Sequence, residues 1–306
     1  MNELQMHLKN YLEYCQFQKR LDKKTLKAYR IDLTQFISQI PVDALSSVTQ
    51  DILEGHIAKL HQKYKPRTVK RKLASLKAFF RHLQYRKLIR QNPFSHMQIK
   101  FREPIILPKT IPLPVVEAFL SAIYTQNLNA KNDYQRKNSL RDAAVIELLF
   151  ATGMRISELC SLKASDVNLS ESTILIHGKG SKERKIQIGS KEVADILKKY
   201  RIAYEKQIQS CQHFFTNQNG SVLSDQAIRR MINKYTSLAA IDLHITPHMF
   251  RHTFATSLLE ADVDIRYIQE MLGHSSINVT EIYTHVAMSK QRDILTTKHP
   301  RNRFHI

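Results

Sequence analysis

A proline-rich segment divides this chain of 306 residues. Four of the nine prolines fall within "EPIILPKTIPLP": Pro104, Pro108, Pro112 and Pro114. Proline fixes φ and has no amide hydrogen, so this segment blocks a continuous helix and favours an extended connection. The length is that of about two ordinary domains. We therefore predict two domains, residues 1–103 and 115–306, joined by a linker over 104–114.

Before the linker, apolar residues recur at helical spacing. In "PRTVKRKLASLKAFFRHL" they stand three or four apart, and "TLKAYRIDLTQFI" repeats the pattern. Such spacing predicts amphipathic helices, and Pro66 fits the first turn of the later one. We expect an all-helical domain in which this helix turns four basic side chains outward, where a binding partner can reach them: Lys70, Arg71, Lys77 and Arg81.

Beyond the linker, the pattern predicts helices together with a hairpin. "STILIHG" and "ERKIQIG" flank the turn "GKGS" and are typical of paired strands. The segment "YTQNLNAKNDYQRKNSL" is expected to be a long loop. Helices are expected near residues 114–126, 138–150, 155–163, 190–208, 224–240, 247–260, 264–272 and 277–285. The predicted fold class is mostly α with a small β-hairpin or sheet, as an all-helical domain followed by an α+β domain.

The charge balance indicates a polyanionic partner. The chain has 47 Lys and Arg against 27 Asp and Glu, a formal net charge of +20. No acidic residue occurs between Glu54 and Glu103, where fourteen Lys and Arg fall. Because helical periodicity runs through the same segment, we expect it to fold rather than to form a disordered basic tail.

Cysteine usage and hydropathy favour a soluble protein of the cytoplasm. The three cysteines are too few and too scattered for a disulfide framework or a cysteine-based zinc site. No stretch approaches the roughly 20 apolar residues that a membrane span requires. We expect neither secretion nor a membrane partner.

The stretch "ITPHMFRHTFATSLLE" leaves three interpretations open. It places His248 and His252 four apart on one helix, but a zinc protease helix requires His-Glu-x-x-His, and Met249 stands in place of the glutamate. His248 and Arg251 share a helix face, and could converge on an anion near a helix start capped by Thr246. Alternatively, both are ordinary surface residues of a helix whose other face is apolar.

Three further segments place polar side chains at turns. "FATGMRISELCSL" places Arg155 just after a glycine turn, with Glu158 one helical turn later. "HGKGSKERK" places Lys179 in a turn with two glycines, and "MLGHSSINVTEIYTHV" places His274 after a helix-ending glycine, with Tyr283 on the next helix. Each motif alone is weak, and their combination is highly specific.

Through these residues the chain resembles the tyrosine recombinases of the phage-integrase family, and most of all their Xer type. Six residues carry the resemblance in this order: Arg155, Lys179, His248, Arg251, His274 and Tyr283. "KKTLKAYRIDL" is similar to the family's N-terminal core-binding domain, and "KHPR" to the Xer C-terminus. The resemblance implies a site-specific recombinase that clamps DNA between two domains. It would cut and rejoin strands through a covalent 3′-phosphotyrosyl intermediate, for integration, excision or resolution of DNA elements.

The chemistry explains why arginine and tyrosine are needed. A phosphodiester is anionic and repels nucleophiles, and two guanidinium groups can clamp its non-bridging oxygens with paired hydrogen bonds that lysine cannot match. Arg155 and Arg251 fit that role. By the resemblance, the phenol of Tyr283 is the nucleophile.

The resemblance also implies the remaining roles. His248 and His274 are added donors to the phosphate, His248 takes part in proton transfer with the tyrosine, and Lys179 is the general acid that protonates the leaving oxygen. Glu158 either orients Arg155 or is an ordinary helix residue. Neither a metal nor any other cofactor is implied.

The implied partners are double-stranded DNA and further copies of the chain. Residues 287–306 are expected to form a terminal helix that docks on a neighbouring subunit, giving a tetramer on two DNA sites, with itself or with a related recombinase. Two other functions remain possible at this point, a type IB topoisomerase and a DNA-binding regulator that no longer cuts. Neither the target sequence nor the DNA element served can be read from the chain.

Overall fold

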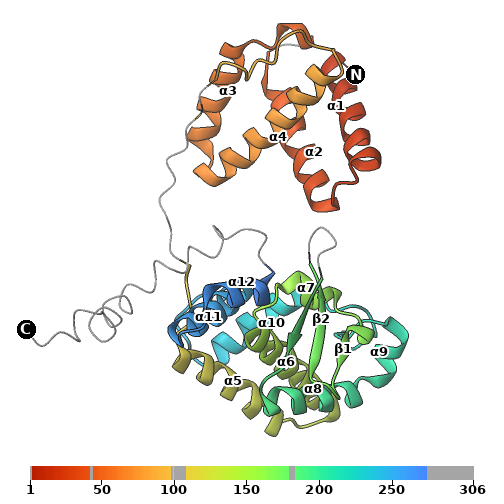
Figure 1. Cartoon of the computed structure of the whole chain (residues 1–306), viewed down its shortest axis with the longest axis vertical. Helices are drawn as coiled ribbons and strands as arrows, with labels where there is room; N and C mark the ends of the chain where they lie inside the picture. Colours follow the sequence, from red (N-terminus) through yellow and green to blue (C-terminus); the bar gives the residue numbers. More distant parts are fainter. Residues whose placement is uncertain (1, 42–43, 98, 100–107, 179–182, 274–306) are drawn as a thin grey trace, which may run out of the picture. The chain divides into compact units, whose positions relative to one another are not determined.

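The computed structural model describes residues 2–41, 44–97, 99, 108–178 and 183–273. The chain divides into two compact units, residues 1–105 and 106–306, whose elements are labelled in Figure 1. Each unit has a hydrophobic core of its own, as expected of separate folding domains.

All elements described in the N-terminal unit are helical. They are, in chain order, α1 (Glu3–Glu13), the π-helical turn η1 (Tyr14–Gln18), α2 (Lys23–Gln39), the 3₁₀ turn η2 (Leu45–Ser47), α3 (Gln50–Lys63) and α4 (Pro66–Tyr85). Pro66 stands in the first turn of α4, as predicted.

The apolar face of α4 forms much of the core of this unit. Five of its apolar residues at helical spacing are buried: Val69, Leu73, Leu76, Phe80 and Leu83. The ring of Phe80 packs edge-on against Phe36 of α2, with ring centroids 6.0 Å apart. Complete burial of such a side chain contributes about 1.5–3 kcal/mol. The spacing of apolar residues therefore predicted correctly which face of α4 turns inward.

A buried carboxylate joins α2 to α4. The side chain of Asp32 is fully buried. It accepts hydrogen bonds from Arg71, from Lys72 Nζ at 3.1 Å and from Ser75 Oγ at 3.0 Å. A charge is tolerated in such a place only when it is paired and hydrogen-bonded. Basic residues of α4 thus help to hold the two helices together.

The C-terminal unit is mostly helical with a small antiparallel sheet, which confirms the predicted fold class. Its elements are α5 (Leu113–Leu128), α6 (Asp133–Thr152), α7 (Ile156–Ser161), the 3₁₀ turn η3 (Ala164–Asp166), β1 (Val167–Asn168), β2 (Thr173–His177), β3 (Glu183–Gln187), α8 (Lys191–Ala203), α9 (Glu205–Cys211), α10 (Asp225–Leu238), α11 (Pro247–Glu260) and α12 (Ile265–Leu272).

The sheet has the order β1-β2-β3 and contains the predicted hairpin (Figure 1). β2 and β3 pair antiparallel, with Ile174 opposite Ile186 and His177 opposite Glu183. Because side chains alternate along a strand, Arg184 shares the inward face of β3 with the buried Ile186. β1 was not predicted, since two residues are too short to show an alternating pattern.

Helix α6 is central to the unit. α5, α8 and α11 all pack against it, and six residues of its middle and last turns are buried: Ala143, Ala144, Val145, Ile146, Leu148 and Leu149. A helix that is apolar on nearly all sides belongs inside a protein. The end of α6 is therefore held firmly, and the chain leaves it toward Arg155 from a fixed point.

The segment that leads into α5 is fastened to α11. Ile111 is buried, and its backbone N donates to Thr253 Oγ1 at 2.8 Å. The hydroxyl of Thr253 in turn donates to the carbonyl oxygen of Met249, one turn earlier in α11, at 2.8 Å. Residues 108–111 are thus attached to the helix that carries His248 and Arg251.

Two expectations about helix boundaries were wrong. The expected long loop is helical for most of its length, since only residues 129–132 separate α5 from α6. Asn132 caps α6 by accepting a hydrogen bond from the backbone N of Gln135 at 2.8 Å, which lets the helix begin early. The expected helix 190–208 is broken at Tyr204, whose backbone leaves the helical conformation while its ring packs against Tyr200 with centroids 4.8 Å apart.

Disulfides and membrane-spanning helices are both missing from the described parts of the chain. The three cysteines, Cys15, Cys160 and Cys211, are free thiols. No helix over the described ranges is both long and apolar enough to cross a bilayer.

Candidate functional site

A turn at Gly153 places Arg155 at the start of α7. Gly153 ends α6 with φ at +58°, in the left-handed region that favours glycine. A Cβ at this position would lie 2.6 Å from Phe254 Cδ1, so no other residue fits without displacement. Arg155 follows as the last residue before α7, with about a third of its side chain exposed.

Glu158 holds Arg155 in place. Its Oε2 accepts from the backbone N of Arg155 at 2.8 Å, and its Oε1 accepts from Arg155 Nη1, also at 2.8 Å. Arg184 donates to the same carboxylate through Nη1 at 3.2 Å and Nη2 at 2.8 Å. Burial acts to raise the pKa of Glu158, but the hydrogen bonds from the two arginines outweigh it and keep the pKa below its ordinary value. Glu158 is thus an ionised anchor shared by two guanidinium groups.

Arg251 is buried between the ends of two helices. Only 4% of the residue is exposed. Its Nη1 donates to the carbonyl oxygen of Gly153 at 2.7 Å and its Nη2 donates to that of Leu272 at 2.7 Å. These carbonyls belong to the ends of α6 and α12, where helical hydrogen bonding runs out. Arg251 is therefore not merely a surface residue, and that alternative is wrong for it.

His248 lies on the exposed side of the first turn of α11. Thr246 takes the N-cap position as predicted, although its hydroxyl makes no capping hydrogen bond. Partial loss of solvent lowers the pKa of His248, and the charges of Arg229, Arg251 and Arg155 lower it further. The imidazole is therefore neutral at pH 7, because protonation would add a charge beside three others.

These contacts bring Arg155, His248 and Arg251 into one neighbourhood. Arg251 is bonded to Gly153, two residues before Arg155, and the charges of both arginines act on His248. The turn after α6 and the first two turns of α11 thus form a positively charged site that contains a single carboxylate partner, Glu158, among the contacts described above. A site of this kind suits an anion.

Sequence reasoning missed two basic residues of this site. Arg184 binds Glu158 from β3, and Arg229 of α10 adds to the charge at His248. A signal for Arg184 was present, since an arginine on the inward face of an alternating strand needs a buried partner. Nothing in the sequence distinguishes Arg229 from its neighbour Arg230.

Three residues of the predicted site lie outside the described residues: Lys179, His274 and Tyr283. Lys179 falls between the described residues Gly178 and Glu183, at the base of the hairpin. The described chain ends at Gly273, the left-handed residue that closes α12, and His274 follows directly. The terminal segment 287–306 and the helix expected near 277–285 also lie outside.

The basic face of α4 is only partly open to solvent. Its four predicted DNA-facing residues are Lys70, Arg71, Lys77 and Arg81. Lys70 and Arg81 are exposed. Arg71 is about half exposed but is paired with Asp32, and Lys77 is half-buried with Nζ 5.9 Å from the ring of Phe94. The charge of Arg71 is therefore partly committed to the fold.

The zinc interpretation of the two histidines gains no support. Among the residues that the structure describes, no three His, Cys, Asp or Glu side chains cluster as metal ligands would.

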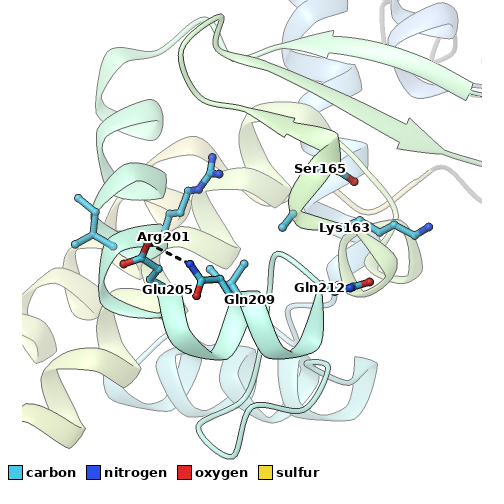
Figure 2. A pocket seen from close by; sticks show the side chains of 9 residues that line it. Lys163, Ser165, Arg201, Glu205, Gln209 and Gln212 are labelled. Carbon is cyan, nitrogen blue, oxygen red and sulfur yellow. Dashed lines mark hydrogen bonds between the residues drawn. The ribbon is translucent and has the colours of Figure 1, made fainter.

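A cavity elsewhere in this unit contains none of the predicted site residues. It has a volume of about 540 Å³ and lies between η3 and the helices α8 and α9. Figure 2 shows its lining, with Lys163 and Ser165 on one side and Arg201, Glu205 and Gln209 on the other. Gln209 Nε2 donates to Glu205 Oε1 at 3.4 Å across one helical turn. The cavity is therefore separate from the arginine site.

Comparison with known proteins establishes the family. Residues 119–290 match the description "Phage integrase family", and residues 8–87 match "Phage integrase, N-terminal SAM-like domain". The first match alone spans more than half of the chain. The chain therefore belongs to the phage integrase family, and its resemblance to that family is confirmed.

The relatives narrow the class to the tyrosine recombinases. The chain is 65% identical over 305 residues to a protein of Agathobacter rectalis named tyrosine recombinase, with 100% of both chains covered. It is 33% identical over 300 residues to tyrosine recombinase XerC of Bacillus pumilus, with 95% of both chains covered. Its fold is similar to that of XerH site-specific recombinase bound to a palindromic difH substrate, with a TM-score of 0.75 at 22% identity, covering 95% of this chain and 83% of the other. As a tyrosine recombinase, the protein is an enzyme of site-specific DNA recombination that works through a covalent phosphotyrosine.

Proposed function

We propose that the protein cuts and rejoins DNA with six side chains: Arg155, Lys179, His248, Arg251, His274 and Tyr283. The observation that supports this most is the attachment of Arg251 to Gly153, which keeps the two arginine-bearing segments together. Two guanidinium groups held in this way can bind the non-bridging oxygens of one phosphate. Each preorganised donor lowers the barrier by an amount on the scale of about 3 kcal/mol.

In this proposal, Tyr283 attacks the phosphorus and forms a 3′-phosphotyrosyl bond, while the 5′-oxygen leaves. A phenol with an ordinary pKa of about 10 needs help to lose its proton at pH 7. His248 can accept that proton because its ring is neutral, although its lowered pKa makes it a weaker base than an ordinary histidine. His274 adds a donor to the phosphate. The covalent bond conserves the energy of the phosphodiester, so rejoining needs no nucleotide or other cofactor.

The proposal is tested by trapping the covalent intermediate. A duplex that carries the protein's own site and a nick next to the cleavage point loses a short fragment after cleavage, so rejoining cannot occur. The wild type should accumulate a protease-sensitive adduct at a DNA 3′-phosphate, with the modified peptide containing Tyr283 by mass spectrometry. A wild type that forms no adduct on any DNA recovered from its bound fraction would be a DNA-binding regulator instead.

We propose Lys179 as the acid that protonates the leaving 5′-oxygen. The Lys179→Ala variant should cleave far more slowly than the wild type, with little change in DNA affinity. A 5′-bridging phosphorothiolate provides the measurement, because its sulfur leaves without a proton. Cleavage of that substrate should recover most of the lost rate. If the variant is equally slow on both substrates, another group is the acid.

DNA phosphates provide most of the binding energy in this proposal. The net charge of +20 and the exposed Lys70 and Arg81 of α4 support a long contact with a polyanion. Such contacts release counterions, so affinity falls steeply as salt increases. Phosphate contacts fix position and base contacts supply specificity, and we assign α4 to the surface that reads the site.

We also propose that four copies assemble on two duplexes, with residues 287–306 of each docking on a neighbour. Ile294 and Leu295 are adjacent apolar residues in this tail and favour burial against another chain. A variant that ends at residue 286 should bind a single site normally and fail to bring two sites together. Native gel electrophoresis with one and two labelled duplexes measures both properties, and a truncated protein that still pairs its sites contradicts the assignment.

A type IB topoisomerase would use similar chemistry, but the family matches over both units favour the recombinase. For its location we propose the cytoplasm, since three free thiols suit a reducing compartment. Cell fractionation provides the check.

A further inference from the structure

Arg184, on β3, contacts two other segments of the C-terminal unit. It lies on the inward face of β3, with 10% of its side chain exposed. Its Nε donates to the carbonyl oxygen of Met271 at 2.8 Å, and both of its terminal nitrogens donate to the carboxylate of Glu158. One side chain thus joins the hairpin of β2 and β3 to the start of α7 and to the end of α12.

The carboxylate of Glu158 is shared unequally by Arg184 and Arg155. Arg184 binds the carboxylate with two parallel N–H donors, the strongest arrangement available to this pair, whereas Arg155 uses one terminal nitrogen and its backbone N. Two arginines against one carboxylate leave a net positive charge. If Arg184 were lost, a buried carboxylate would have Arg155 as its main partner and would draw that guanidinium further toward itself.

Arg184 also contacts the end of α12. The last four carbonyls of a helix have no helical donors, and cations stabilise this end. Arg184 takes the carbonyl of Met271 and Arg251 takes that of Leu272. A Cβ on Gly273 would lie 3.0 Å from Arg184 Nη1, so this residue is packed directly against the guanidinium. Arg184 therefore fixes the point from which the chain continues to His274.

We propose that Arg184 is a positioning residue for DNA cleavage: it neutralises Glu158 so that Arg155 keeps donors for the phosphate, and it fixes the end of α12 beside the site. The inference rests on the proposed roles of Arg155 and His274. In this proposal the hairpin that bears Lys179 also sets the position of the Arg155 guanidinium, directly before α7.

The test compares Arg184→Gln and Arg184→Lys with the control Lys185→Gln. Lys185 is the next residue on β3, but its side chain is 63% exposed and pairs with the surface residue Glu171 at 3.5 Å. Single-turnover cleavage of the nicked duplex by Arg184→Gln should be slower by about 100-fold, the loss expected from a misplacement near 1 Å, with DNA affinity within about twofold of wild type. Arg184→Lys keeps the charge but lacks the fork, so its rate should fall in between. The control should match the wild type.

Two readouts separate positioning from a general loss of structure. A methylphosphonate at the cleavage point removes the anionic oxygen that Arg155 would bind, so the defect of Arg184→Gln should shrink markedly on that substrate. An equal defect on both substrates overturns the proposal. The second readout is the NMR signal of Arg155 Nε–H, assigned through Arg155→Lys, which should move in both Arg184 variants and stay in place in the control.

The NMR readout needs no cleavage, so it tests the inference even if the wild type forms no adduct. An unmoved Arg155 signal in a folded Arg184→Lys protein overturns the positioning role by itself. A moved signal together with an inactive wild type would instead contradict the proposed nucleophile and leave the positioning role supported. If Arg184→Gln does not fold, the same measurements are made on Arg184→Lys.

Discussion

Replacing Tyr283 with phenylalanine is expected to abolish the covalent adduct completely while leaving DNA affinity nearly unchanged. The substitution removes one oxygen and keeps the aromatic ring, so packing is conserved and only the nucleophile is lost. No neighbouring group in the proposed site can replace a phenol that must remain bonded to the DNA 3′-phosphate. In the nicked-duplex assay the wild type should convert a large fraction of the DNA, and the variant none above background.

Two controls make this result decisive. The melting temperature of Tyr283→Phe should equal that of the wild type, and its complex with the same duplex should form at the same protein concentration. If the variant forms the adduct as well as the wild type does, the nucleophile is another residue. Mass spectrometry of the trapped peptide would then identify it directly.

Replacing Arg251 with glutamine is expected to damage both cleavage and stability. Cleavage should fall by about 100-fold to 1,000-fold, the usual effect of removing one preorganised donor to a developing anion. The carbonyls of Gly153 and Leu272 would lose their buried donors, and each buried acceptor left without a partner costs about 1–3 kcal/mol. The melting temperature should therefore fall by about 4–24 °C for a unit of this size.

The matched control is Arg201→Gln. Arg201 is an exposed arginine on α8 of the same unit and lines the separate cavity, so its loss should change neither the melting temperature nor the cleavage rate. Thermal unfolding followed by circular dichroism measures the first, and the nicked duplex measures the second. Unchanged stability in Arg251→Gln would show that the helix ends find other donors and that the buried contacts of Arg251 matter little.

The sequence predicted well wherever a local pattern had a single physical solution. The spacing of apolar residues in α4 allowed only one inward face, and proline and glycine marked the start of α4 and the left-handed ends of α6 and α12. The arginine of the "ATGMRISEL" motif lies directly before α7, and that of "HMFRHTFAT" lies in α11.

What the sequence could not reveal depends on contacts between distant segments. The pairing of Asp32 with Arg71 crosses 39 positions, and the pairing of Glu158 with Arg184 crosses 26. No periodicity records such partners, because the inward face of β3 indicates only that Arg184 needs a buried partner and not which residue that partner is. The short strand β1 and the early start of α6 were missed for a different reason, since each is decided by one or two residues.

The hydrogen bond between Ile111 and Thr253 anchors the end of the proline-rich segment to α11. Residues 108–111 are bonded to α11 at Thr253, two residues after Arg251, and Thr253 in turn bonds to Met249 one turn earlier. Because α11 packs against α6, its position is set by the core of the unit rather than by a surface loop. The C-terminal end of the linker is thus attached to the same helix as Arg251, the guanidinium that we propose binds the phosphate.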